Sequence, residues 1–236
     1  MELSVIIPVY NQQENIGKNL IKLKNCLSKS FIDFEIIAVN DGSSDQSLKI
    51  LETLSFIRLI SYPKNKGKGY AVRRGVMAAR GKYIFFTDAD LSYSPEEIYR
   101  ATNILKEEKS DGIIGVRYFK QSDYPPIRRF LSDTFSSLVK FYLHLDIKDS
   151  QCGFKGFEKA CARNIFANLT IFRFGFDMEL LLEAQNEKLK ISSLPVSFTH
   201  FPSSSLKLFK DSREMLFSLF KLKIRRARLE KYRYTK

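Results

Sequence analysis

Residues 3–39 read LSVIIPVYNQQENIGKNLIKLKNCLSKSFIDFEIIAV, and this stretch decides the fold class. Its two ends, Leu3–Val9 and Phe34–Val39, are continuous apolar runs of the kind found in strands that are buried on both faces. Between them, Glu14–Leu27 carries apolar residues at helical spacing. A strand, a helix and a second strand in this order form a unit with parallel strands, so we expect an α/β fold.

The same alternation continues along the first half of the chain. It predicts a mostly parallel central sheet sandwiched by helices, a Rossmann-like arrangement. Ligands of such sheets bind at the carboxyl ends of the strands, so we expect the loops at residues 8–11, 40–45 and 88–90 to converge on one cleft. The further elements that we expect are helices at Ser44–Leu54, Tyr70–Ala79 and Pro95–Lys109, and strands at Phe56–Ser61, Lys82–Thr87 and Gly112–Val116.

The second half of the chain is less regular. Ile127–Leu143 has an apolar stripe at helical spacing, and Phe176–Gln185 is also expected to form a helix. Ser150–Phe157 (SQCGFKGF) resembles a strand punctuated by glycines, and Ile191–Phe198 is expected to be a further strand. With 236 residues, the chain has the length of one large domain, with or without an appendage.

The composition is that of a globular protein. Hydrophobic residues at 44% and charged residues at 28% exclude a disordered tail protein and a fibrous repeat. The three cysteines form no C-x-x-C pair, which favours a reducing compartment, and two histidines argue against a His-rich metal site or a Ser-His-Asp triad. No apolar run approaches the ~20 residues that span a bilayer, and residues 1–8 do not form a signal peptide, so we expect a cytoplasmic protein.

Positive charge is concentrated at the end of the chain. The net charge is +13, and residues 206–236 carry eleven basic and three acidic side chains. Such a segment can bind nucleic acid, anionic lipid headgroups or only water. Apolar residues near helical spacing indicate a basic amphipathic helix, which favours a membrane surface over nucleic acid. The alternative is a helix that packs on the core and exposes its basic back to solvent.

Two carboxylates, Asp88 and Asp90, close the strand that ends in Phe85-Phe86-Thr87. Side chains one residue apart on an extended segment point the same way, and crowded like charges resist joint ionisation unless a cation pairs with them. Mg²⁺ and Mn²⁺ prefer oxygen ligands, so the pair indicates a site for one of these ions. The structural alternative is that Asp90 caps the helix that begins at Pro95.

Two further loops carry polar residues at expected strand ends. Asp41 and Asp45 follow the second strand, where a carboxylate can accept from a ribose hydroxyl or a base N–H. Ser44 or Asp45 is also expected to cap the next helix. The segment Asn65–Gly69 (NKGKG) offers close backbone approach and two ammonium groups at a helix start, which suits a pyrophosphate, although it lacks P-loop spacing. A solvated loop is the alternative.

Six short motifs follow one another along the chain: Pro8-Val9-Tyr10-Asn11, Asn40-Asp41-Gly42-Ser43-Ser44-Asp45, Asn65-Lys66-Gly67-Lys68-Gly69, Asp88-Ala89-Asp90-Leu91, Gly115-Val116-Arg117-Tyr118 and Gln151-Cys152-Gly153-Phe154-Lys155. In this order they resemble the family 2 glycosyltransferases of the GT-A fold, above all the dolichyl-phosphate or polyprenyl-phosphate glucosyl- and mannosyltransferases. The resemblance runs from Leu3 to about Lys207. Asp149–Lys155 is more similar to the glucosyl branch.

The resemblance implies a nucleoside diphosphate sugar, UDP-glucose ahead of GDP-mannose, as donor. It assigns donor binding to Pro8, Tyr10, Asp41, Lys68, Asp88, Ala89 and Lys207, with Asp88 and Asp90 on a Mg²⁺ or Mn²⁺ ion and Arg117 reaching the sugar or its phosphates. Three residues depart from the pattern of relatives: Gln12 and Ser92, which affect expected metal affinity or choice, and Phe201, which stands where some relatives have a phosphate-binding Arg.

The acceptor decides whether a base is needed. A polyprenyl phosphate is largely anionic near neutral pH, because phosphate monoesters have a second pKa of about 6, so no general base is required. Arg128 and Arg129 would hold that phosphate, or else be solvated arginines on a core-packed helix. A hydroxyl of a glycan would instead require a carboxylate base, for which Asp177 and Glu179 are the candidates. The alternative is that these two acidic residues only stabilise the start of a helix through the helix macrodipole.

Two other classes of protein remain as alternatives. A metal-dependent nucleotidyltransferase would also use paired aspartates, but the start of the chain lacks its glycine- and lysine-rich signature. A non-enzymatic basic module for membranes or nucleic acid would explain the tail and leave the aspartates without a role. For the favoured enzyme we expect a transferase domain at 1–205, a basic helix or tail at 206–236, and peripheral attachment to an anionic inner membrane face, with a membrane-protein partner as an option and no nucleic acid. Within the domain, 1–118 would bind the nucleotide sugar and 119–205 the acceptor.

Overall fold

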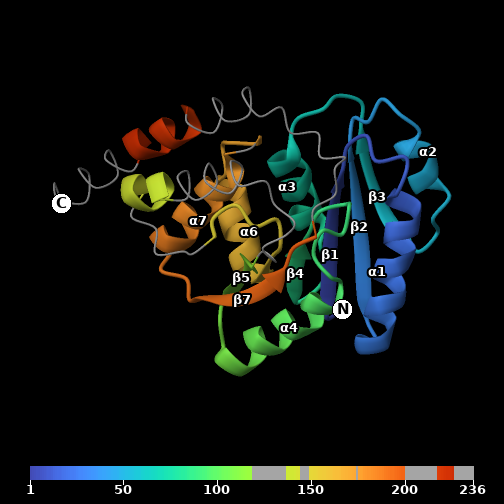
Figure 1. Ribbon diagram of the computed structural model, residues 1–236, viewed down its shortest axis with the longest axis horizontal. Helices are drawn as coiled ribbons and strands as arrows, with labels where there is room; N and C mark the ends of the chain where they lie inside the picture. The colour runs from blue at the N-terminus through green and yellow to red at the C-terminus, as the bar shows by residue number, and fades with distance from the viewer. Residues whose placement is uncertain (119–136, 144–148, 174, 200–216, 226–236) are drawn as a thin grey trace.

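A seven-stranded sheet forms the centre of the computed structural model, which describes residues 1–118, 137–143, 149–173, 175–199 and 217–225 (Figure 1). The order of the strands is β3-β2-β1-β4-β6-β5-β7. Their bounds are β1 Leu3–Val9, β2 Phe34–Asp41, β3 Ile57–Tyr62, β4 Tyr83–Phe86, β5 Gly112–Tyr118, β6 Lys155–Glu158 and β7 Ile191–Ser197.

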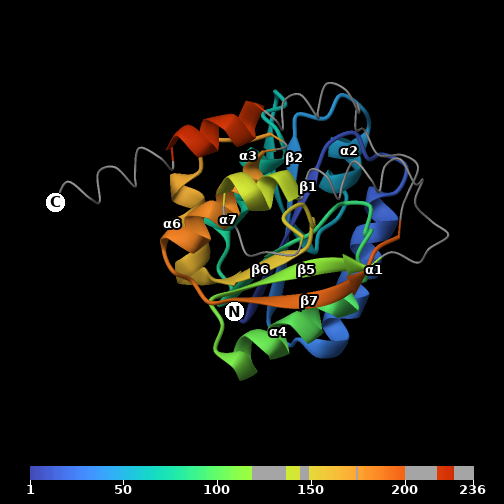
Figure 2. The same ribbon diagram turned by 60° about the vertical axis from the view of Figure 1, so that its left-hand side comes forward.

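Six of the seven strands follow the expected parallel pattern. β1 pairs in parallel with β2 and β4, β2 pairs in parallel with β3, and β5 pairs in parallel with β7. The short β6 lies between β4 and β5 and is antiparallel to both. Figure 2 shows β6 beside β5, with β7 on the other side of β5. The prediction of a mostly parallel sheet is therefore confirmed.

The expected strand at Ser150–Phe157 is wrong over most of its length. Only the strand from Lys155 onward joins the sheet, and residues 150–154 form turns and bends. The backbone N–H of Gly153 donates to the hydroxyl of Tyr93 over 3.0 Å, so it is not available to a strand ladder.

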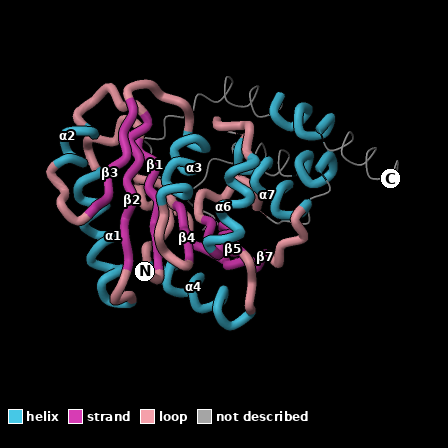
Figure 3. The backbone as a smooth tube through the Cα atoms, turned by 180° about the vertical axis from the view of Figure 1, so that it is seen from behind, coloured by secondary structure: helices cyan, strands magenta, loops and turns pink. Residues whose placement is uncertain are grey.

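Helices cover both faces of the sheet (Figures 1 and 3). On one face, apolar side chains of α1, α2 and α4 pack against strand residues such as Val5 and Phe85, and on the other α3, α6 and α7 pack against residues such as Ile6 and Phe86. Because both faces are buried, the strands can be apolar throughout. The bounds of the helices are α1 Ile16–Ser30, α2 Ser47–Glu52, α3 Lys68–Ala78, α4 Glu96–Glu108, α6 Lys159–Asn168 and α7 Phe176–Asn186.

Two short helical segments, residues 137–143 and 217–225, form a third apolar cluster together with α7. Leu219 and Leu222 are almost completely buried in it. For the described part of the basic tail, the expectation of a helix that packs on the core is therefore confirmed. The structure describes only the end of the expected helix at Ile127–Leu143. Among the described residues, no helix is both long enough and apolar enough to span a membrane.

Candidate active site

The loops that follow β1 and β2 are joined by hydrogen bonds at the carboxyl edge of the sheet. Asn11 has a left-handed backbone, with φ of 52°, and its side-chain Oδ1 accepts the N–H of Ser44 at 2.8 Å. The N–H of Asn11 donates in turn to the hydroxyl of Ser43 at 3.1 Å. Pro8 ends up beside Val39 in the parallel register, and the Tyr10 side chain is exposed at the start of the first loop.

Asp45 stabilises the start of α2. Its carboxylate accepts the N–H of Ser47, the first residue of that helix, and the N–H of Gln13 in the first loop. Partial burial alone would raise the pKa of Asp45, but the hydrogen bonds from Ser47 and Gln13 outweigh it and lower that pKa. The N-cap of α2 is Gln46, without a side-chain cap hydrogen bond, so the expectation that Ser44 or Asp45 is the cap is wrong, although Asp45 binds the first residue of the helix from one position further out.

Asp41 is almost completely buried at the end of β2 and binds the loop that precedes α3. Its two carboxylate oxygens accept the N–H groups of Lys66 at 2.7 Å and Gly67 at 2.9 Å. Burial, and after it the charge of Asp41, raises the pKa of the neighbouring Tyr62 hydroxyl. Asp41 therefore connects the second loop to the glycine-containing segment that the sequence singled out.

The glycines of that segment make room for the protein itself. Gly67 has φ of 100°, and a Cβ on it would lie 2.5 Å from the carbonyl oxygen of Phe172. A Cβ on Gly69 would lie 2.6 Å from the Cβ of Phe176. The N–H of Gly69 donates to the carbonyl oxygen of Phe172 over 2.8 Å. The close backbone approach that the sequence predicted is therefore made to the segment before α7.

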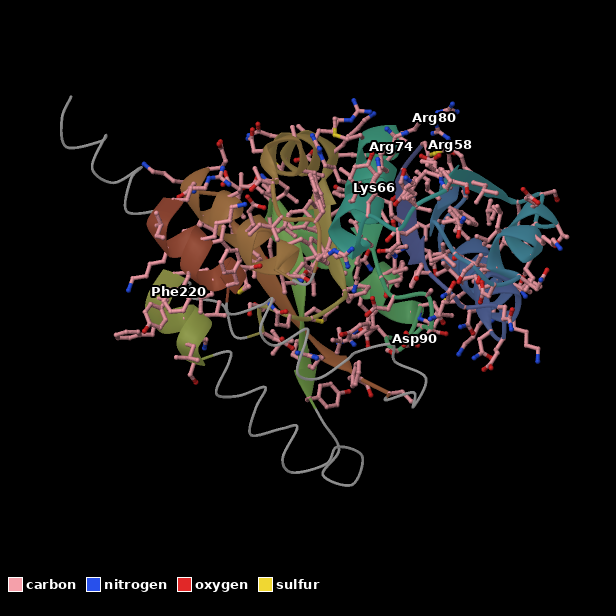
Figure 4. The ribbon with its side chains drawn as sticks, turned by 90° about the horizontal axis from the view of Figure 1, so that it is seen from above. Arg58, Lys66, Arg74, Arg80, Asp90 and Phe220 are labelled. Atoms are coloured by element: carbon pink, nitrogen blue, oxygen red, sulfur yellow. The ribbon has the colours of Figure 1, made fainter. Side chains whose placement is uncertain are left out.

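The two lysines of the segment point in different directions. Lys66 is exposed, its ammonium 4.6 Å from the ring centre of Tyr70 (Figure 4). Lys68 forms an ion pair with Asp88 at the end of β4. Burial alone would lower the pKa of Lys68, but Asp88, Asp177 and Asp90 together raise it. The Lys68 side chain therefore stays positively charged at neutral pH.

Asp88, Ala89 and Asp90 form a tight turn after β4. The carbonyl of Asp88 accepts the N–H of Leu91, and Asp90 accepts the N–H of Ser92 over 2.9 Å. The buried Ala89 accepts a hydrogen bond from the side chain of Asn19 in α1, which fixes the turn against that helix. Because α4 begins at Glu96 and has no side-chain cap, the alternative that Asp90 caps α4 is wrong.

The second half of the chain adds a buried ion pair that the sequence did not predict. Lys155, in β6, has no exposed surface, and its ammonium pairs with Asp177 in the first turn of α7. The same ammonium donates to the carbonyl oxygen of Cys152 over 2.5 Å. Burial raises the pKa of the Cys152 thiol to about 11, which keeps it protonated at neutral pH. The three cysteines carry free thiols.

Arg117, expected at the sugar or its phosphates, binds Asp149 through two parallel hydrogen bonds. Its Nε and Nη2 lie 2.7 Å and 2.9 Å from the two oxygens of Asp149. Burial alone would raise the pKa of Asp149, but the guanidinium outweighs it and lowers that pKa. Arg117 thus ties the end of β5 to the turn at residues 149–153.

Glu179, the second candidate base, is completely buried. None of the four hydrogen bonds described for its side chain involves Asp88 or Lys68. Its carboxylate accepts from the Arg225 guanidinium, from the N–H and the hydroxyl of Thr170, and from the N–H of Ile171. Four residues that the sequence singled out lie outside the described residues: Arg128, Arg129, Phe201 and Lys207.

The donor atoms at the β4 turn fit a divalent cation. Asp88 and Asp90 offer carboxylate oxygens, which Mg²⁺ and Mn²⁺ prefer. The ammonium of Lys68 pairs with Asp88 in this structure, so a metal ion would take the place of that ammonium beside Asp88. Among the residues that the structure describes, no group of three or more His, Cys, Asp or Glu side chains could hold a metal ion. Mg²⁺ sites elsewhere commonly use one or two carboxylates together with substrate phosphates and water, and Asp88 and Asp90 are two carboxylates of this kind.

The family model for glycosyl transferase family 2 matches residues 4–166. The chain belongs to this family. It is therefore a glycosyltransferase, which decides against the nucleotidyltransferase and the non-enzymatic basic module. It is 37% identical to the dolichyl-phosphate beta-glucosyltransferase of Dictyostelium discoideum over 94% of this chain and 74% of the relative, and 34% identical to the Drosophila melanogaster protein of the same name over 95% and 75%.

Solved structures are similar to this fold. Glucosyl-3-phosphoglycerate synthase from Mycobacterium tuberculosis, in complex with Mn²⁺, UDP-glucose and phosphoglyceric acid, superimposes with a TM-score of 0.72. The match covers 93% of this chain and 79% of that one at 18% identity. The GT-A fold that the motifs implied is thus confirmed.

Proposed function

We propose that this glycosyltransferase moves glucose from UDP-glucose to a dolichyl or other polyprenyl phosphate, with inversion at the anomeric carbon. The observation that carries the proposal is the 37% identity to a dolichyl-phosphate beta-glucosyltransferase along 94% of the chain. The contacts that join Asp41, Lys68 and Asp88 at the carboxyl edge of the sheet support it, because that edge binds ligands in α/β folds.

Donor binding is proposed for the residues at this edge. Asp41 and Tyr10, with Pro8, would bind the nucleotide, and Lys68 would bind the diphosphate. Lys68 would have to exchange its ion pair with Asp88 for the diphosphate, which a bound divalent cation favours by taking over the charge of Asp88. As the resemblance implies, Lys207 would bind the donor, and Arg117 would reach the sugar or its phosphates. We also propose that residues 1–118 bind the donor and 119–205 the acceptor.

Asp88 and Asp90 would hold the Mg²⁺ or Mn²⁺ ion. When bound, the ion would neutralise charge on the departing nucleoside diphosphate. The M. tuberculosis glucosyl-3-phosphoglycerate synthase that shares this fold is described with Mn²⁺ and UDP.

The acceptor phosphate supplies its own nucleophile. Its oxygen is already largely anionic near neutral pH, so the protein has only to bring it in line with the anomeric carbon and to stabilise the leaving group. Arg128 and Arg129 are proposed to hold it. A glycan hydroxyl would need Asp177 as a base, and the pairing of Asp177 with the buried Lys155 favours the phosphate acceptor.

An anionic membrane is the proposed location of the acceptor, on its cytoplasmic face. Helical residues 137–143 and 217–225 expose an apolar and basic surface, and these two segments contain no acidic residue. We call this surface the aromatic–basic patch: Phe141, Phe217, Phe220, Ile224, Lys140, Lys221 and Lys223. In Figure 4, Phe220 lies at the outer end of the molecule, away from Asp90. Such a surface suits a membrane interface, with or without a membrane-protein partner.

Incubation with labelled UDP-glucose and vesicles that contain dolichyl phosphate tests the proposal. We expect label in an acid-labile lipid product, dependent on Mg²⁺ or Mn²⁺. Label transferred only to a glycan hydroxyl, or only from GDP-mannose, would contradict it. The Asp41→Asn variant serves as the matched loss-of-binding control, because the amide removes one acceptor from the Lys66–Gly67 backbone.

A further inference from the structure

The carboxylate of Asp88 lies directly against the backbone of the turn at residues 150–154. A Cβ on Gly153 would lie 2.2 Å from Oδ2 of Asp88 and 2.9 Å from its Cγ. Gly153 does not have a positive φ, so its backbone conformation is open to any residue. Glycine is therefore needed here for space: any side chain would push the Asp88 carboxylate out of its position beside Lys68.

The turn is bound from the side of the sheet by a hydrogen bond and by buried aromatic packing. The N–H of Gly153 donates to the hydroxyl of Tyr93, and the neighbouring Phe154 is buried with its ring centre 5.8 Å from that of Phe85 and 6.2 Å from that of Tyr93. The turn therefore cannot yield easily to Asp88, and the contact between them confines Asp88 instead.

Lys155 holds the same turn from the other side. Its ammonium donates to the carbonyl of Cys152, the residue before Gly153, and pairs with Asp177. In the sheet, Lys155 lies opposite Phe86, which is two residues before Asp88, so the turn and Asp88 extend from the same pair of strands. Removing an ammonium from water is costly, and a well-packed apolar side chain of similar volume would be at least as stable at such a position. A buried lysine here is therefore better explained by what its ammonium holds.

We propose that Gly153 and Lys155 are positioning residues for the donor site: Lys155 fixes the Cys152 carbonyl, which seats Gly153 against Asp88 and confines the Asp88 carboxylate to the orientation that meets Lys68. The inference rests on the proposed function, because only a donor site would use the orientation of the Asp88 carboxylate, to bind a divalent cation and the diphosphate. Neither residue touches the donor itself in this scheme.

The first test is a double-mutant cycle in stability, which needs no ligand. Gly153→Ala is expected to lower the urea midpoint, because the new methyl group meets Asp88. In an Asp88→Ala background that obstacle is gone, so at least half of the loss should disappear. Equal losses in both backgrounds would overturn the contact on which the proposal rests. Gly17→Ala is the matched control, because its Cβ would meet only Ile50 at 3.2 Å and it lies in α1.

The second test measures UDP binding in the presence of Mn²⁺ by calorimetry. Gly153→Ala is expected to weaken binding at least tenfold, with Gly17→Ala at the parent affinity. The double variant Lys155→Met/Asp177→Asn removes the buried charges together, and we expect it to fold and to bind UDP at least tenfold more weakly than the parent. Parent affinity in either variant would overturn the proposal. If the parent protein binds no UDP, the proposed donor is refuted. The double-mutant cycle in urea would still show whether Gly153 and Asp88 are in contact.

Discussion

Arg225 binds Glu179, with its Nη1 2.5 Å from Oε1 of a carboxylate that has no exposed surface. The other guanidinium nitrogen lies 3.0 Å from Glu183, whose pKa is raised mainly by burial. Glu179 also accepts three hydrogen bonds from Thr170 and Ile171. One arginine of the basic tail therefore pairs with two acidic side chains inside the fold.

Removing Arg225 should destabilise the protein strongly. Arg225→Ala leaves Glu179 as a buried charge without its partner, and we expect the free energy of unfolding to fall by about 3 kcal/mol. Urea denaturation measures this. The control is Lys221→Ala on the exposed side of the same helix, which should change stability by less than about 0.5 kcal/mol. Similar values for the two variants would contradict a structural role for Arg225.

The pair of Arg117 and Asp149 predicts a specific acid dependence. The pKa of Asp149 is lower in the folded protein than its ordinary value of 3.8, so its stabilising contribution is complete above about pH 4 and is lost as the pH falls through the lower folded value. In Arg117→Gln, the buried Asp149 loses its partner and its pKa should rise. The stability difference between parent and variant should therefore be largest near pH 7 and shrink toward pH 3.

Urea denaturation of both proteins between pH 7 and pH 3 checks this. Other carboxylates titrate in both proteins, so their effect cancels in the difference. A difference that stays constant over the whole range would show that the two side chains are not coupled.

The aromatic–basic patch should mediate binding to anionic vesicles. Phe217→Ser/Phe220→Ser removes two side chains that are 72% and 57% exposed, so it should leave the fold intact and weaken vesicle binding severalfold. Sedimentation with phosphatidylserine vesicles measures this, and higher salt should weaken the binding of the parent. Ile32→Ser, a fully exposed apolar residue between α1 and β2, is the control. Equal binding by all three proteins would remove the patch from the proposed membrane contact.

Asp177→Asn separates the two acceptor classes. The amide oxygen can still accept from Lys155, so we expect UDP binding to persist. Transfer to dolichyl phosphate should also persist, because that acceptor needs no base, and label in the acid-labile lipid product measures it. Complete loss of transfer with unchanged UDP binding would support Asp177 as a base and a hydroxyl acceptor. Asp33→Asn, at an exposed residue before β2, is the control.

The elements that the sequence predicted well are those whose pattern is local. The apolar runs of β1, β2 and β4 and the stripe of α1 were identified to within a few residues at each end. Helix α6 was not predicted, although Ala162, Ile165 and Phe166 form its buried face. Arginine and asparagine residues interrupt that stripe, so its periodicity is weak. The antiparallel insertion of β6 depends on pairing with β4, some 70 residues earlier in the chain, and no local pattern reports such pairing.

The candidate site divides in the same way. Strand ends predicted that the loops of Asp41 and Asp88 would converge on one cleft. In the structure the two are linked through the segment Lys66–Gly69, whose backbone binds Asp41 and whose Lys68 binds Asp88. The partners of Arg117 and Lys155 were not predicted, since each ion pair joins elements that are separated by more than twenty residues. The motif Gln151–Lys155 carries the resemblance to the family, but the local pattern does not report that Lys155 is buried.

The position of β6 has a consequence for synthesis of the protein. β4 and β5 emerge from the ribosome before residues 155–158, yet they are not neighbours in the sheet and need that late strand to join them. Until it arrives, β4 has an unpaired edge and β5 lacks both of its partners. The nascent N-terminal half would thus be a target for chaperones. If the coding sequence is divided after residue 118, the two fragments should be recovered in soluble form only when they are co-expressed.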